Sequence, residues 1–111
     1  MTEPNTFARL VLTTTTTPEE AARLGRTLVE ERLAACSTLL PGVRSIYRWQ
    51  GAVEDSAESL LLIKTSAALI AALETRLHQL HSYQTPEFLV LSPESGSPAY
   101  LAWLAAALEK A

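Results

Sequence analysis

The strand candidates of this chain are apolar on both faces, and this feature most constrains its fold. Leu10-Val11-Leu12, Leu60-Leu61-Leu62-Ile63 and Phe88-Leu89-Val90-Leu91 are continuous apolar runs. Because successive side chains of a strand point to opposite faces, a sheet with one face in water should alternate apolar and polar residues. Two helices can cover one face of such a small sheet. Either a third helix or other copies of the chain must then cover the second face.

The length and composition predict one domain over residues 7–111, preceded by a loose polar tail over residues 1–6. A chain of 111 residues can bury a core without disulfides or metals. Its single cysteine favours a reducing, cytoplasmic compartment. The net charge of −3, with both signs interspersed, argues against nucleic-acid binding and a polybasic membrane patch. The longest apolar stretch, 99–108, is too short to span a bilayer.

Periodicity and turn signals predict the element order β-α-β-β-α-β-α. The expected strands are residues 7–14, 36–49, 53–64 and 87–91, and the helices begin at Pro18, after the expected cap Ser66, and at Pro98. Thr17-Pro18-Glu19-Glu20 forms a capping box at the first helix. The first six elements match the ferredoxin-like split β-α-β plait, an α+β fold. Right-handed crossovers then predict an antiparallel sheet of order 4-1-3-2 with two helices on one face.

The two middle strands form a hairpin that is longer than usual. Pro41-Gly42 interrupts the first of them, which predicts an edge strand or a bulge. Gly51 marks the turn, and Tyr47 and Trp49 lie near the tip. We expect this arm to project past the core of its own domain.

About six large apolar side chains of the central strands should point away from the first two helices. Leaving these side chains in water would lose a hydrophobic stabilisation on the order of 10 kcal/mol, which is comparable to the whole free energy of unfolding of a domain. One solution is the third helix folding over this face, with an apolar side of Tyr100, Leu101, Leu104, Leu108 and Trp103. The solution that we favour is symmetric self-association, with the arms reaching onto neighbouring copies.

Four segments carry a family resemblance. They are Glu30–Cys36, Leu40–Gly51, Leu60–Thr65 and His81–Glu87, which reads His-Ser-Tyr-Gln-Thr-Pro-Glu. Together they resemble the CutA family of divalent-cation tolerance proteins over nearly all of residues 8–104. The resemblance implies a ferredoxin-like homotrimer similar in architecture to PII signalling proteins. It also implies a role in tolerance to copper and other divalent metals, and it does not imply an enzyme.

The last of these segments departs from the family pattern, which usually reads His-Pro-Tyr-Glu-X-Pro-Glu. Ser82 replaces a proline, so we expect a looser turn. Gln84 replaces a carboxylate, which weakens any role of that position in binding a hard cation. His81, Tyr83 and Glu87 match the pattern.

Three residues are the candidate metal ligands: Cys36, His81 and Glu87. Cys36 is either a soft ligand for Cu(I) or a small buried hydrophobe. His81, which the resemblance supports, either binds an ion with Glu87 or interacts with the C-terminus of its helix. His78 could share that ion or be solvated. No Cys-x-x-Cys motif is present, so we expect copper or another divalent cation to bind weakly, without being required for folding.

The aromatic residues predict a second kind of site, a small-ligand cleft between subunits. Its predicted lining is Tyr47, Trp49 and Tyr83, with Arg44, Lys64 and Glu87 as polar groups. The alternative is that these aromatics are trimer contacts. The predicted function is therefore a trimeric metal-tolerance protein, or alternatively a PII-like adaptor that binds a metabolite. Without a nucleophile elbow or a glycine-rich phosphate loop, an enzyme using Tyr83 and Glu87 is the least favoured reading.

Overall fold

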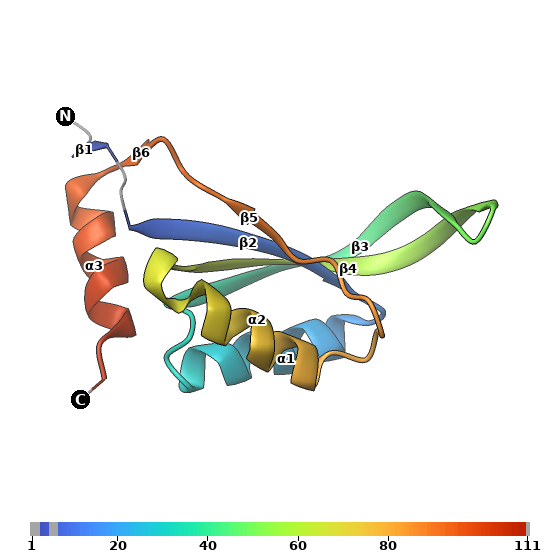
Figure 1. The fold of residues 1–111 in the computed structure, drawn as a ribbon, viewed down its shortest axis with the longest axis horizontal. Coiled ribbons are helices and arrows are strands. Elements are labelled where there is room, and N and C mark those ends of the chain that lie inside the picture. Colours follow the sequence, from blue (N-terminus) through green and yellow to red (C-terminus); the bar gives the residue numbers. More distant parts are fainter. Residues whose placement is uncertain (1–2, 5–6, 111) are drawn as a thin grey trace.

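The computed structural model describes residues 3–4 and 7–110 (Figure 1). The elements are β1 (Glu3–Pro4), β2 (Ala8–Thr15), α1 (Pro18–Glu30), β3 (Cys36–Trp49), β4 (Ala52–Ser66), a 3-10 turn (Ala67–Leu69), α2 (Ile70–Leu80), β5 (Leu89–Leu91), β6 (Ser95–Gly96) and α3 (Pro98–Leu108). The tail predicted over residues 1–6 lies outside the described residues at 1–2 and 5–6. Between them, β1 pairs with β6 in a two-stranded sheet.

The main sheet has four antiparallel strands in the order β3-β4-β2-β5. Helices α1 and α2 lie side by side on one face of it (Figure 1). The predicted α+β class, with a four-stranded antiparallel sheet and three helices, is confirmed. Among the described residues, no helix combines the length and the hydropathy that crossing a membrane requires.

The two N-terminal caps differ in how well the sequence predicts them. At α1 the side chain of Thr17 accepts a hydrogen bond from the backbone N–H of Glu20 at 3.1 Å, and Pro18 occupies the first helical turn. This confirms the Thr17 half of the capping box, whereas the Glu20 side chain accepts a hydrogen bond from Ser82 instead of returning to Thr17. The prediction for Ser66 is wrong, because its side chain makes no capping hydrogen bond. A 3-10 turn separates Ser66 from α2, so the hydroxyl does not face the first N–H groups of that helix.

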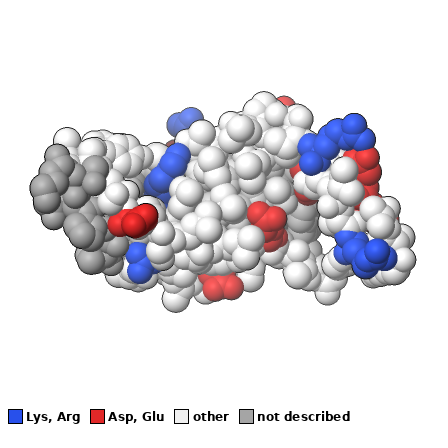
Figure 2. Space-filling model, turned by 90° about the horizontal axis from the view of Figure 1, so that it is seen from above, with Lys and Arg blue, Asp and Glu red and all other residues white. Residues whose placement is uncertain are grey.

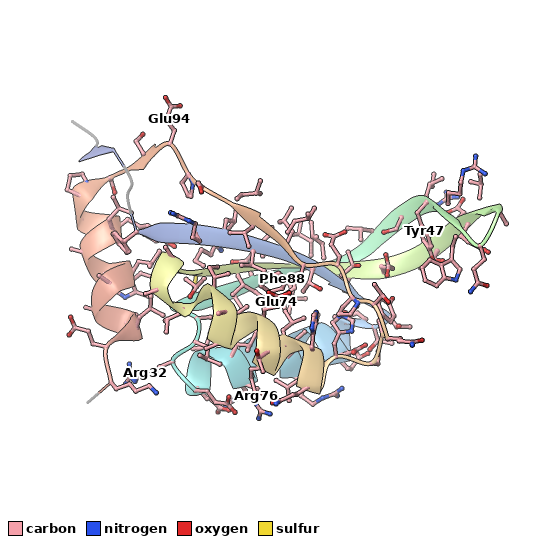
Figure 3. All side chains as sticks on the ribbon, viewed as in Figure 1. Arg32, Tyr47, Glu74, Arg76, Phe88 and Glu94 are labelled. Atoms are coloured by element: carbon pink, nitrogen blue, oxygen red, sulfur yellow. The ribbon has the colours of Figure 1, made fainter. Side chains whose placement is uncertain are left out.

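The core lies between the sheet and the helices α1 and α2. Its strand residues Val11, Leu61 and Ile63 are fully buried, because each points from the sheet toward the helices. The helices contribute the apolar residues Leu24, Leu28, Leu73 and Leu77. Phe88, which leads into β5, packs against this cluster (Figure 3).

The opposite face of the sheet carries seven leucines, which we call the open leucine face. Strand register places them together: Leu10 is level with Leu91, and Leu12 is level with Leu62 and Leu89. The seven are Leu10, Leu12, Leu40, Leu60, Leu62, Leu89 and Leu91, of which Leu40 on β3 is level with Leu60. The side chains of β5 are the most exposed, at 57% for Leu89 and 46% for Leu91. Seen from this side, the middle of the molecule shows few charged atoms (Figure 2).

Helix α3 does not cover the open leucine face. It stands across one end of the sheet (Figure 1), where Leu104 packs with Ala8 and Ala35. The alternative in which the third helix folds over this face is therefore wrong for most of it. The predicted apolar side of α3 is also only partly used, because Leu101 and Leu108 join the cluster but Tyr100 and Trp103 remain about half exposed.

The β3–β4 hairpin projects beyond the helices, as predicted (Figure 1). We call its outer part, residues 43–58, the hairpin arm. A bulge between Leu40 and Val43 contains Pro41 and Gly42, and the φ of +72° at Gly42 is a conformation that glycine adopts without strain. Gln50 and Gly51 form the turn, with φ values of 50° and 84°. Positive φ at both positions suits a two-residue turn between twisted strands.

Candidate functional site

A cleft of about 750 Å³ lies between the hairpin arm and the loop that follows α2. We call it the arm cleft. The arm side is formed by Ser45, Ile46, Tyr47, Trp49 and Glu58, the loop side by residues 83–87, and Thr14 contributes from the end of β2. Figure 3 shows Tyr47 on the arm, beyond the part of the sheet that the helices cover. The cleft therefore depends on how the loop is held against the rest of the chain.

His81 holds the start of this loop. Its side chain is buried, and its Nε2 lies 2.7 Å from the carbonyl oxygen of Thr14. Its Nδ1 accepts a hydrogen bond from the backbone N–H of Tyr83 at 3.0 Å. Since a carbonyl oxygen can only accept, Nε2 carries the proton in this arrangement. Both ring nitrogens are engaged, so no nitrogen lone pair of His81 is available to a metal ion.

Glu20, near the start of α1, holds the next residue of the loop. Its carboxylate is 6% exposed and accepts a hydrogen bond from the backbone N–H of Ser82 at 2.9 Å. Burial raises the pKa of the Glu20 carboxyl, but the hydrogen bonds from Ser82 and the nearby His81 outweigh it, so the pKa lies below its ordinary value. A proline at position 82 would have no N–H to donate. Ser82 therefore gives this turn a contact that the family's usual proline cannot make.

Tyr83 links the loop to the hairpin arm. Its hydroxyl donates a hydrogen bond to Glu58 Oε2 at 2.5 Å, and its ring lies against His81 with the ring centres 4.8 Å apart. Burial, followed by the hydrogen bond to the Glu58 carboxylate, raises the pKa of Tyr83 to about 12. Tyr83 therefore stays neutral near pH 7 and keeps its proton on the donated bond.

Glu58 and Glu20 were not among the predicted site residues. Glu58 is 8% exposed and lies two residues before Leu60, where the apolar run of β4 begins, so a carboxylate entering a core strand was the available signal. For Glu20, the capping box explained the residue locally. Its contact with Ser82 spans 62 positions in sequence, which no spacing rule detects.

Of the predicted cleft residues, Tyr47, Trp49, Tyr83 and Glu87 come together in the arm cleft. Arg44 and Lys64 do not line it. Arg44 forms an ion pair with Asp55 through two hydrogen bonds of 2.5 and 3.2 Å. Lys64 points to the open leucine face, where it donates to Thr38 Oγ1 at 2.6 Å. Each cation is thus held by a neighbour on the adjacent strand.

The predicted metal ligands do not meet within one chain. Cys36 on β3 pairs with Lys64 on β4, which in turn pairs with Leu10 on β2. His81 contacts Thr14, which lies four residues beyond Leu10 on β2. Four strand residues correspond to roughly 13 Å. Over residues 3–4 and 7–110, no three His, Cys, Asp or Glu side chains are grouped to hold a metal ion. His78 is exposed and lies edge-on to Phe88, so it is not placed to share an ion with His81.

Cys36 is partly exposed at the start of β3, so it is not the fully buried hydrophobe of the alternative reading. Its sulfur lies 3.8 Å from the hydroxyl oxygen of Tyr100 on α3. Burial and the contact with Cys36 raise the pKa of Tyr100. The thiol is therefore accessible, with a phenol as its polar neighbour.

Comparison with known proteins places this geometry in a family. The family model for CutA1 divalent ion tolerance protein matches residues 9–107. The divalent-cation tolerance protein CutA of Pectobacterium atrosepticum is 50% identical over 95 residues, which cover 84% of this chain and 86% of that protein.

Two solved structures show the same fold. CutA from Synechococcus elongatus PCC7942 superposes with a TM-score of 0.94 at 39% identity, over 98% of this chain and 96% of that one. The periplasmic divalent cation tolerance protein CutA from Archaeoglobus fulgidus has a TM-score of 0.88 at 29% identity, over 92% and 99%. The family-model match over residues 9–107 and the shared fold lead to one conclusion: this chain belongs to the CutA1 family of divalent ion tolerance proteins.

Proposed function

We propose that this chain acts in divalent-cation tolerance as a homotrimer of ferredoxin-like plaits whose arm cleft binds a small ligand, in the manner of PII-type signalling proteins. The observation that carries the proposal is the arm cleft itself. Three aromatic side chains and a few polar groups converge there, and hydrogen bonds from His81, Ser82 and Tyr83 hold its loop wall in place. A concave site with apolar walls and few polar groups is typical of small-molecule binding.

The open leucine face supports self-association. Fully burying a leucine is worth about 1.5–3 kcal/mol, and the seven partly exposed leucines on one face offer several times that amount. Contiguous apolar patches of this kind mark interaction surfaces in soluble proteins. The hairpin arm, which extends beyond its own core, can reach a neighbouring copy. Three copies related by an axis would cover all three faces and leave the arms near subunit boundaries.

Light scattering at micromolar concentration tests the assembly. We expect a particle of about three times the 12.1 kDa chain mass. Leu89→Glu places a charge on the open leucine face and should dissociate the particle, whereas Ala72→Glu on the exposed side of α2 should leave it intact. A wild-type particle with the mass of one chain would contradict the proposal.

A thermal-shift screen of small metabolites tests the arm cleft. A ligand that binds only the folded state, at 100 times its Kd, stabilises a protein by about 2.7 kcal/mol. We expect at least one compound to raise the melting temperature of wild type and to raise it less in Tyr47→Ala. His78→Ala serves as the control, because His78 is exposed and lies outside the cleft lining. Equal responses of wild type and Tyr47→Ala would show that the ligand binds elsewhere.

Direct copper binding is the second candidate function, and the accessible thiol of Cys36 favours it. We propose a weak site formed where subunits meet, with Cys36 and Glu87 as ligands. His81 would join only if it released Thr14 or Tyr83. Copper titration of wild type, Cys36→Ala and His81→Ala tests the assignment. Weaker binding in Cys36→Ala supports it, and equal affinity in all three proteins contradicts it.

We also propose a cytoplasmic location, on the ground that the one cysteine has no disulfide partner in its own chain. The relative from Archaeoglobus fulgidus is described as periplasmic, so the compartment can differ within the family. Cell fractionation with an antibody against the native protein decides between the two compartments.

A further inference from the structure

We infer that the arm cleft takes an organic cation, a protonated or quaternary amine, as its ligand. The inference rests on the proposed function of the cleft as a small-ligand site, and it names the chemical class of that ligand. Charge, aromatic walls and the accessibility of the lining carry the argument.

The charged groups that line the arm cleft are both acidic. They are the carboxylates of Glu58 and Glu87, and the described residues that line the cleft include no lysine or arginine. Two cationic residues were predicted to line the cleft, but each contacts another side chain instead. Arg44 pairs with Asp55, and Lys64 donates a hydrogen bond to Thr38. In the described part of the chain, Glu87 has no ion-pair partner. A low-dielectric cleft lined by one sign of charge concentrates ligands of the opposite sign.

The walls of the cleft add a second attraction. Tyr47 and Trp49 are two residues apart on β3, so their side chains project from the same face of the strand. Tyr83 lines the cleft from the loop side. The face of an aromatic ring attracts an ammonium group within about 6 Å of its centre, and tryptophan does so best. Trp49 is 53% exposed in the single chain, so no contact within its own chain covers its ring.

The same features disfavour the other ligand classes. An anion would meet two carboxylates and no compensating cation. A bare metal ion prefers several grouped oxygen, nitrogen or sulfur donors, and no such group occurs over residues 3–4 and 7–110. The Glu58 carboxylate is in addition partly satisfied by Tyr83. Aromatic faces beside carboxylates fit an amine that carries apolar groups around its charge.

Matched probes that differ only in charge test the inference. Choline, its uncharged isostere 3,3-dimethylbutan-1-ol and the anion 3,3-dimethylbutanoate are titrated against Trp103→Phe protein. The chain has two tryptophans, so this variant leaves Trp49 as its sole tryptophan reporter. We expect choline to change Trp49 fluorescence and to bind about tenfold more tightly than the alcohol.

Variants in the same background locate the effect. Glu87→Gln should weaken choline binding severalfold without changing binding of the alcohol. Glu94→Gln, at the far end of the molecule (Figure 3), should change neither. Because Glu87 and Glu94 are both exposed, neither substitution disturbs the core.

The outcomes separate the inference from the function on which it rests. If the alcohol or the anion binds as tightly as choline, or if Glu87→Gln has no effect, the cationic class is overturned while the cleft remains a ligand site. If no probe alters Trp49 fluorescence and no metabolite gives a Tyr47-dependent thermal shift, the proposed function fails together with the inference.

Discussion

Replacing Tyr83 with phenylalanine removes the hydroxyl that links the loop wall of the arm cleft to Glu58. The ring and its contact with His81 are retained, so the change isolates one hydrogen bond. A hydrogen bond to a charged group contributes about 1.5–3 kcal/mol to the free energy of unfolding. Removing the hydroxyl leaves the buried Glu58 carboxylate without this donor. Because the Tyr83 side chain is partly exposed, we expect Tyr83→Phe to lower the free energy of unfolding by about 1.5–2 kcal/mol at pH 8.

The same substitution has a pH signature. The pKa of Tyr83 rises from its ordinary 10.0 to about 12 on folding. Below pH 10 the tyrosine is neutral in both states, and its contribution to stability is complete. Between pH 10 and 12 it ionises in the unfolded chain before it does so in the folded protein, so the contribution falls as pH rises. Two pKa units correspond to at most about 2.7 kcal/mol, and partial exposure reduces this to about 1–2 kcal/mol.

Urea unfolding of wild type and Tyr83→Phe at equal chain concentration, from pH 8 to pH 12, measures both effects. The difference between the two proteins should be largest below pH 10 and should shrink toward zero near pH 12. Tyr47→Phe is the control: its hydroxyl meets Ser56 at 3.2 Å on the exposed arm, and we expect its loss to change stability by no more than about 0.5 kcal/mol. A difference that is absent at pH 8, or that does not change with pH, would refute the assigned role of the Tyr83–Glu58 bond.

Three further substitutions test the packing around the site by urea unfolding. Gly25→Ala places a Cβ 2.9 Å from Cβ of Ser37. We expect the free energy of unfolding to fall by about 1 kcal/mol, because overpacking outweighs the gain in helix propensity. The loss should shrink when Ser37→Gly is added. Glu20→Gln should cost stability at pH 7. Its difference from wild type should begin to shrink as pH falls below about 4.5 and should vanish only below the lowered pKa of the folded protein, since the unfolded chain takes up the proton first. Thr17→Ala removes the cap of α1 and should cost about 1 kcal/mol at any pH between 6 and 8.

Local signals predicted the parts of the fold that local contacts determine. The Thr17 cap, the helix beginning at Pro18 and the strand Cys36–Trp49 depend on residues that are neighbours in sequence. The bulge at Gly42 could be predicted for the same reason, since proline and glycine restrict the backbone wherever they occur. The pairing of β1 with β6 carried no such signal, because two-residue strands have no periodicity.

The candidate site was predictable only in its loop and arm. The hairpin pattern predicted that Tyr47 and Trp49 lie near the tip of the arm, and the family resemblance identified the segment that contains Tyr83. The bonds that position them join residues far apart in sequence, such as Tyr83 with Glu58 and Ser82 with Glu20. Arg44 and Lys64 do not line the arm cleft within one chain, because cross-strand partners, invisible before the register is known, hold each of them.

The apolar runs that first constrained the fold are divided by strand geometry into two sets with different surroundings. Val11, Leu61 and Ile63 are fully buried by α1 and α2, whereas their sequence neighbours Leu12 and Leu62 lie on the face that α3 leaves open. Hydrophobic burial within one chain explains the first set and gives no reason for the second. A monomeric protein would be more soluble with polar residues at the strand positions that face away from α1 and α2. The second set is what the proposed self-association would bury, and such contacts would bring neighbouring arms and their clefts to the boundaries between copies.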